Sequence, residues 1–91
     1  MSHSKVTQEM IAELFETILK IKNEEQCRDF FEDLCTNKEI EQMAQRVKSA
    51  KLLIEGKTYN QVIEETDISS ATLSRVSRCV QYGKGYSELL K

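Results

Sequence analysis

The chain has 91 residues, of which 40% are hydrophobic and 31% charged, with three Gly, no Pro and a net charge of −2. This length suits a single domain, and so few turn-forming residues exclude a β-sandwich or a β-barrel. No apolar run is long enough to span a membrane and the polar N-terminus lacks a signal peptide, so we expect a cytoplasmic protein with no membrane partner.

The net charge conceals an asymmetry between the two halves of the chain. Residues 1–45 carry a charge of −5, and residues 46–91 carry +3. The pI of about 5.4 is low for a chain that binds nucleic acid, whereas fields act locally, over a Debye length of about 10 Å. The bulk charge therefore argues against a nucleic-acid partner and the asymmetry argues for one.

The first predicted helix covers residues 7–22, with Thr7 as its N-cap. Seven of the twelve residues from 10 to 21 are large and apolar, which is a wider stripe than one surface helix needs. The few remaining helices of so short a chain cannot cover all of these side chains. We therefore expect the surplus to pack against a second copy of the chain.

The second predicted helix covers residues 23–35, where Asn23 and Gln26 resemble a capping box. Its apolar residues share one helical face: Cys27, Phe30, Phe31, Leu34 and Cys35. The three Cys of the chain form no CxxC pair, and His3 is the sole histidine. These cysteines are accordingly expected to be reduced core residues, and no metal site is predicted.

The longest predicted helix covers residues 36–55 and forms the spine of the domain. Thr36 and Glu39 make a T-x-x-E capping box, and Gly56 is a natural residue to follow the last turn. The expected buried seam advances in steps of three and four residues, and consists of Ile40, Met43, Val47, Ala50 and Ile54.

Two short helices joined by a tight turn come next, which is typical of a helix-turn-helix. Thr58 and Gln61 form a capping box for the first, and Ser69 or Ser70 caps the second. Asp67 is expected to adopt the left-handed conformation in the turn. The apolar residues that would hold the motif together are Val62, Ile63, Ile68, Leu73, Val76 and Val80.

The outer face of the second short helix combines small hydroxyl side chains with two arginines. Small hydroxyls let a helix approach a groove closely, and Arg bonds two acceptors on guanine or a phosphate. The candidate DNA-binding residues are Ser69, Ser70, Thr72, Ser74, Arg75 and Arg78, together with Lys57 before the motif. Helix caps and solvated polar faces have the same composition, so the joint spacing of the apolar residues is what favours DNA binding.

Gly83 and Gly85 are expected to end this helix. The remaining residues would form one or two turns that pack through Tyr86, Leu89 and Leu90, or would fray. The roles of Tyr82 and Tyr86 stay open.

Residues 36–80 resemble the Trp repressor superfamily, and the whole chain is similar to its YerC/YecD-like branch. The resemblance rests on QRV at 45–47, LIEG at 53–56 and ATLSR at 71–75. It implies an all-α, Trp repressor-like domain that forms an intertwined homodimer and acts as a transcriptional repressor.

The resemblance also places Arg46 and Arg75 where two arginines of the Trp repressor flank the ring of its corepressor. Val76 stands where the repressor has a glycine beside that ring, and the turn before the recognition helix is one residue shorter. Both departures argue against tryptophan as a ligand, and another small effector stays open. No other cofactor is predicted.

We therefore expect one helical domain over residues 1–91, with core and dimerisation helices at 7–55, the helix-turn-helix at 58–80 and a C-terminal turn or short helix at 81–91. The expected function is sequence-specific DNA binding by a homodimeric regulator, a repressor, that reads a pseudo-palindromic operator. The alternative is a dimerisation or protein-interaction module that has lost DNA binding. An enzyme is not expected, because the chain has no glycine-rich phosphate loop and its one Ser-His grouping is Ser2, His3 and Ser4.

Overall fold

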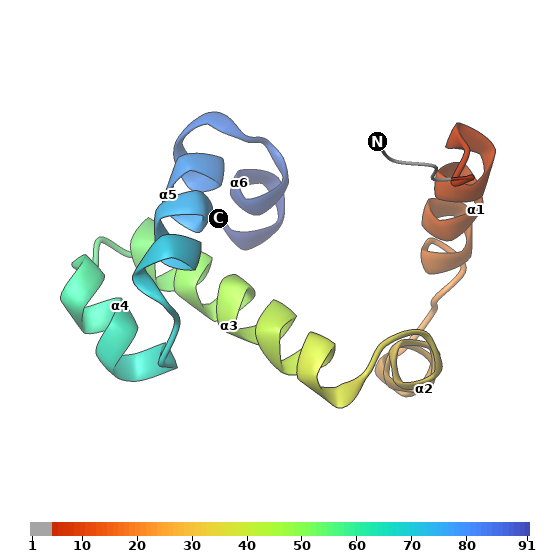
Figure 1. Ribbon diagram of the computed structural model, residues 1–91, viewed down its shortest axis with the longest axis horizontal. Coiled ribbons are helices and arrows are strands. Elements are labelled where there is room, and N and C mark those ends of the chain that lie inside the picture. Colours follow the sequence, from red (N-terminus) through yellow and green to blue (C-terminus); the bar gives the residue numbers. More distant parts are fainter. Residues whose placement is uncertain (1–4) are drawn as a thin grey trace. The chain divides into compact units, whose positions relative to one another are not determined.

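The computed structural model describes residues 5–91, and the described residues form α-helices without any strand. The all-α class predicted from the sequence is therefore confirmed. The Ser2, His3 and Ser4 grouping lies outside the described residues. The elements in chain order are α1 (Gln8–Ile18), α2 (Glu24–Leu34), α3 (Asn37–Ile54), α4 (Tyr59–Thr66), α5 (Ser70–Tyr82) and α6 (Gly85–Leu90), as Figure 1 shows.

The chain divides after Thr36 into two compact units. The first contains α1 and α2, and both helices begin at the predicted caps. Thr7 accepts a hydrogen bond from the amide of Met10, and Asn23 accepts one from the amide of Gln26. The Gln26 side chain accepts from the amide of Lys22 at 2.9 Å, one residue before the position that a capping box predicts.

No residue of α1 or α2 is buried in the single described chain. The α1 side chains Met10 and Phe15 are more than half exposed, and Leu19, in the turn after α1, is 83% exposed. Cys27, Phe30 and Phe31 of α2 are half-buried, and the two Phe rings meet edge to face. The first unit thus carries an amphipathic pattern without a buried core of its own.

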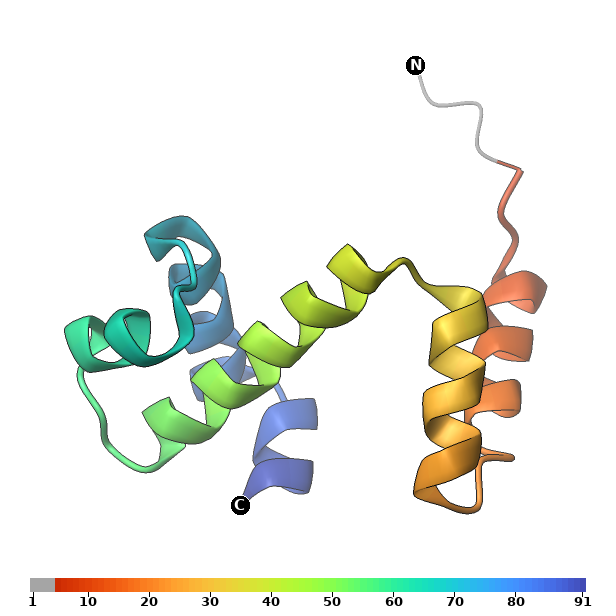
Figure 2. The ribbon, with the colours of Figure 1, turned by 90° about the horizontal axis from the view of Figure 1, so that it is seen from below.

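The second unit is built around α3, against which α4, α5 and α6 all pack (Figures 1 and 2). Its buried apolar core consists of Ala50, Leu52, Val62, Ile68, Leu73 and Val76. Leu53, Ile63, Val80, Tyr86 and Leu90 pack around this core while remaining partly exposed. The predicted packing of the helix-turn-helix is therefore confirmed, as is the packing of Tyr86 and Leu90, whereas Leu89 is 85% exposed.

The buried face of α3 matches the predicted seam in part: Ala50 is buried, and Ile40, Met43 and Ile54 are half-buried. The buried residues are Ser49, Ala50 and Leu52, and Val47 is 45% exposed. Apolar residues spaced by three and four positions are expected in a helix that packs against a neighbouring helix along one side only. Here three helices pack around α3, so burial spreads sideways to Ser49 and Leu52.

We predict that Leu73→Ala lowers the free energy of unfolding by about 2–5 kcal/mol, because the fully buried Leu73 side chain would leave a cavity in this core. The matched control, Gln81→Ala on the same helix, should change it by less than about 0.5 kcal/mol, because Gln81 is exposed. Urea unfolding followed by circular dichroism, at one protein concentration, measures both. Equal effects of the two substitutions would contradict the core described above.

Candidate nucleic-acid interface

The first helix of the motif, α4, begins at a complete capping box. The Thr58 hydroxyl oxygen accepts from the amide of Gln61 at 3.2 Å, and the Gln61 side-chain oxygen accepts from the amide of Thr58 at 2.9 Å. Gly56, just before this cap, has a φ of 93°, a conformation that suits glycine. The predicted capping box of α4 and the predicted glycine after α3 are both confirmed.

The turn between α4 and α5 has the predicted left-handed residue. Asp67 has φ 60° and ψ 20°, and its amide donates to the carbonyl of Ile63 at 2.8 Å. The next residue, Ile68, is 3% exposed and belongs to the buried core. The chain therefore reverses at Asp67 and inserts Ile68 between the two helices and α3.

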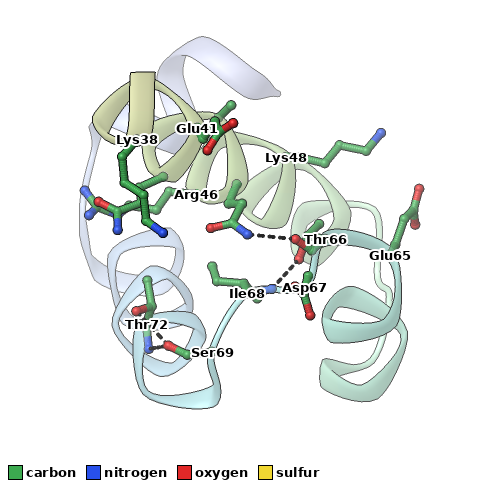
Figure 3. A pocket seen from close by; sticks show the side chains of 13 residues that line it. Lys38, Glu41, Arg46, Lys48, Glu65, Thr66, Asp67, Ile68, Ser69 and Thr72 are labelled. Carbon is green, nitrogen blue, oxygen red and sulfur yellow. Dashed lines mark hydrogen bonds between the residues drawn. The ribbon is translucent and has the colours of Figure 1, made fainter. Parts of the chain in front are cut away.

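The second helix of the motif, α5, begins at Ser69, which resolves the two possible caps. The Ser69 hydroxyl oxygen accepts from the amide of Thr72 at 3.2 Å, and the hydroxyls of Ser69 and Thr72 lie 2.9 Å apart (Figure 3). These two candidate DNA-binding residues are thus bonded to each other at the start of the helix.

The outer face of α5 is polar, cationic and exposed. Leu73 and Val76 bury the inner face in the core, and the outer face carries Ser70, Ser74, Arg75 and Arg78, which are all exposed. Within residues 5–91 the side chains of Arg75 and Arg78 make no hydrogen bond or ion pair. Lys57 is also exposed, in the link between α3 and α4. Both guanidinium groups can therefore bind an acceptor from another molecule.

A polar pocket of about 730 Å³ lies where α3 faces the turn and the start of α5 (Figure 3). Its wall includes both cationic and acidic side chains, namely Lys38, Arg46, Lys48, Glu41, Glu65 and Asp67. Ser69 and Thr72 line it from the α5 side. Arg46 is thus on the wall, but Arg75 is not, so this pocket does not bring together the two residues that the family resemblance pairs.

Sequence reasoning missed a hydrogen-bonded group that joins α3 to the turn. The Gln45 side-chain amide donates to the carbonyl of Thr66 at 3.1 Å, and the Ser49 hydroxyl donates to that of Thr66 at 3.3 Å. Ser49 is fully buried. The sequence does contain one signal for this group, because Ser49 stands directly before Ala50 of the expected buried seam. A hydroxyl buried at such a position requires a hydrogen-bond partner.

Residues 5–91 contain neither a cluster of metal ligands nor a helix suited to a bilayer. No group of three or more His, Cys, Asp or Glu side chains there could hold a metal ion. Among the helices of this part of the chain, none combines the length and apolar character needed to cross a bilayer.

The fold and the exposed face of α5 define a helix-turn-helix regulator of the DNA-binding type. The model of the family described as Trp repressor protein matches residues 9–91. The chain therefore belongs to the Trp repressor family, and the resemblance seen in the sequence is confirmed. The family is one of transcription regulators, not of enzymes.

Relatives support the same assignment along nearly the whole chain. The YerC protein of Bacillus subtilis (strain 168) is 44% identical over 89 residues, which covers 98% of this chain and 86% of that protein. A candidate Trp repressor from Staphylococcus aureus, whose crystal structure is known, has a sequence 41% identical to this chain. The two structures superpose with a TM-score of 0.87, and the match covers 99% of this chain and 91% of the other. A TrpR-like protein from Eubacterium eligens ATCC 27750 has a sequence 44% identical to this chain. Its structure superposes with a TM-score of 0.84, and the match covers 91% of this chain and 86% of the other.

The left-handed turn gives a test of the motif's geometry. Asp67→Gly should leave the free energy of unfolding unchanged or raise it by up to about 1 kcal/mol, because glycine adopts this conformation freely. Asp67→Val should lower it by about 1–2 kcal/mol or more, because a β-branched residue is strained there. Urea unfolding compares the two variants, and a valine variant as stable as the glycine variant would contradict the left-handed turn.

Proposed function

We propose that this protein is a transcriptional repressor that binds a pseudo-palindromic operator as a homodimer, with α5 of each subunit in the major groove. The observation that carries the proposal is the outer face of α5, where Arg75 and Arg78 are exposed and have no partner within residues 5–91. The groove admits a helix of this kind, and half-sites about 34 Å apart would receive two such helices. The protein would act in the cytoplasm.

The side chains of α5 would make different kinds of contact with DNA, according to their chemistry. Arg75 and Arg78 can bond guanine edges or phosphates, and Ser70 and Ser74 are short enough to let the helix approach the bases. Ser69 and Thr72 hold the start of α5, whose free amides suit a phosphate. Lys57 supplies a further cation beside the motif.

Homodimer formation is supported by apolar surface that the single chain leaves uncovered. The exposed α1 side chains have no cover in the described chain. An apolar groove of about 530 Å³ also lies between α3, α5 and α6, and is lined by Val47, Cys79, Tyr86, Leu89 and Leu90, with Gly83 and Gly85. Burial of such surfaces against a second copy is the favourable term expected for a stable dimer.

An effector that gates DNA binding would act from the polar pocket beside the turn, where Arg46 lines the wall. Tryptophan is not the ligand expected there. Neither Arg75 nor Val76 lines this pocket, and Val76 is buried in the core instead.

We predict that replacing both Arg75 and Arg78 with Ala weakens binding to the duplex selected from random DNA by at least about tenfold, because up to two charge-assisted contacts are lost. The slope of log affinity against log salt should fall by about one for each phosphate contact removed. Fluorescence anisotropy over a salt series measures both quantities.

The control for this experiment is Arg28→Ala, because Arg28 is an exposed arginine outside the motif and pairs with Glu24 at 3.1 Å. Its DNA affinity should match that of the unaltered protein. Binding that does not depend on salt, or that survives the double substitution, would refute the proposal. A protein partner retained through nuclease and salt treatment, with no DNA bound, would favour the interaction module.

We predict that light scattering gives a mass twice the 10.5 kDa of one chain. Replacing Phe15 and Leu19 together with Glu should shift the protein towards the monomer, because four charges would then lie on the apolar surface of each dimer. Glu16→Gln, on the polar side of α1, is the matched control and should leave the mass unchanged. A monomeric mass for the unaltered protein across the concentration range would overturn the dimer.

A further inference from the structure

The hydroxyl of Thr66, the last residue of α4, uses its full hydrogen-bonding capacity. It donates to the carbonyl of Val62 at 2.8 Å, and it accepts from the Ser49 hydroxyl and from the amide of Ile68, both at 3.3 Å. A hydroxyl has one hydrogen to donate and two lone pairs to accept. The oxygen of Thr66 is therefore bonded to α3, to α4 and to the turn at once (Figure 3 shows the bond to Ile68).

Two residues of α3 hold Thr66, and they lie one helical turn apart. Gln45 binds the backbone carbonyl of Thr66, and Ser49, four residues later, binds its side chain. Residues four apart lie on the same face of a helix, so α3 presents both groups to one point. We define these three residues, Gln45, Ser49 and Thr66, as the Thr66 clamp.

Only residues 67–69 separate the Thr66 clamp from the first turn of α5. The apolar contacts of Leu73 and Val76 hold α5 against the core, and the hydrophobic attraction behind them is itself non-directional. Hydrogen bonds weaken steeply when their angles change, so the clamp restricts orientation as well as distance. The clamp therefore adds directional contacts from α3 close to the start of α5.

We propose that the Thr66 clamp fixes the angle between α3 and α5 and thereby sets how well the protein discriminates between DNA sequences. Thr66 is thus a positioning residue, which acts on DNA only through α5. Phosphate contacts tolerate small changes of angle, whereas contacts to base edges do not. The proposed effect on the angle between α3 and α5 concerns the protein without DNA, whereas the effect on discrimination between DNA sequences rests on the proposed function.

The first experiment requires no DNA. Residual dipolar couplings of backbone amides in α3 and α5 report the angle between the two helices. Thr66→Val keeps the shape of the side chain and removes the hydroxyl, so the α5 couplings should change or average towards zero relative to those of α3. Thr66→Ser keeps the hydroxyl and should leave them unchanged.

A matched pair of glutamines separates the clamp from the pocket. Gln42 and Gln45 both line the polar pocket, but within residues 5–91 only Gln45 bonds to the turn. Gln45→Ala should alter the α5 couplings, and Gln42→Ala should not. If Thr66→Val does not fold, this pair of variants still tests the clamp. Gln45 is only half-buried, so its replacement is expected to leave the chain folded.

The second experiment measures the ratio of affinities for the selected duplex and for an unrelated duplex of equal length, on variants shown to be folded by circular dichroism. Thr66→Val and Gln45→Ala should lower this ratio by about tenfold, the order expected for losing one or two hydrogen bonds, while the salt slope stays unchanged. Thr66→Ser and Gln42→Ala should retain the ratio.

The outcomes separate the two proposals. Unchanged α5 couplings in both Thr66→Val and Gln45→Ala would overturn the clamp, and so would an unchanged ratio in folded variants. If the unaltered protein binds no duplex, the proposed function fails, and the dipolar couplings still decide whether the clamp sets the helix angle.

Discussion

The structure of the second unit depends on the burial of one apolar set beneath the helix-turn-helix. Val62 from α4, Ile68 from the turn, and Leu73 and Val76 from α5 meet Ala50 and Leu52 of α3. Because α5 buries Leu73 and Val76, its opposite side must face outward, and that side carries serines and arginines. The exposed cationic face is thus a direct consequence of which residues are apolar.

The same motif shows how apolar and polar contacts differ in what they determine. The apolar set drives the association of α4 and α5 with α3, since its area is removed from water. Caps and turn residues then fix where each helix begins: the capping box at Thr58, the left-handed Asp67 and the Ser69 cap. Gln45 and Ser49 add the directional contacts between elements that apolar packing does not supply.

The two units differ in how much of their apolar surface a single chain buries. In the second unit six apolar side chains are almost fully buried, whereas no residue of α1 or α2 is buried in the single described chain. An amphipathic helix gains most of its stability by covering its apolar face. The apolar stripe of α1 therefore accounts for the proposal that a second subunit completes the fold, which the sequence pattern had already suggested.

The sequence by itself determined where the first helices begin, through the caps at Thr7, Asn23 and Thr58, and also the left-handed Asp67 and the buried set of the motif. It left Ser69 and Ser70 as alternative caps of α5, and it extended the first helix to residue 22, whereas α1 ends at Ile18. Each of the features that it determined depends on a local rule, such as a capping hydroxyl or the three-and-four spacing of a helix, which a linear pattern retains.

Only the tertiary structure decided that Val47 is exposed, that Ser49 and Leu52 are buried, that Leu89 lies outside the core, and that Arg46 lines a pocket without Arg75. The bonds of Gln45 and Ser49 to Thr66 join residues 21 and 17 positions apart. Which helices surround α3, and from which side, depends on long-range packing, and no local spacing in the chain records it.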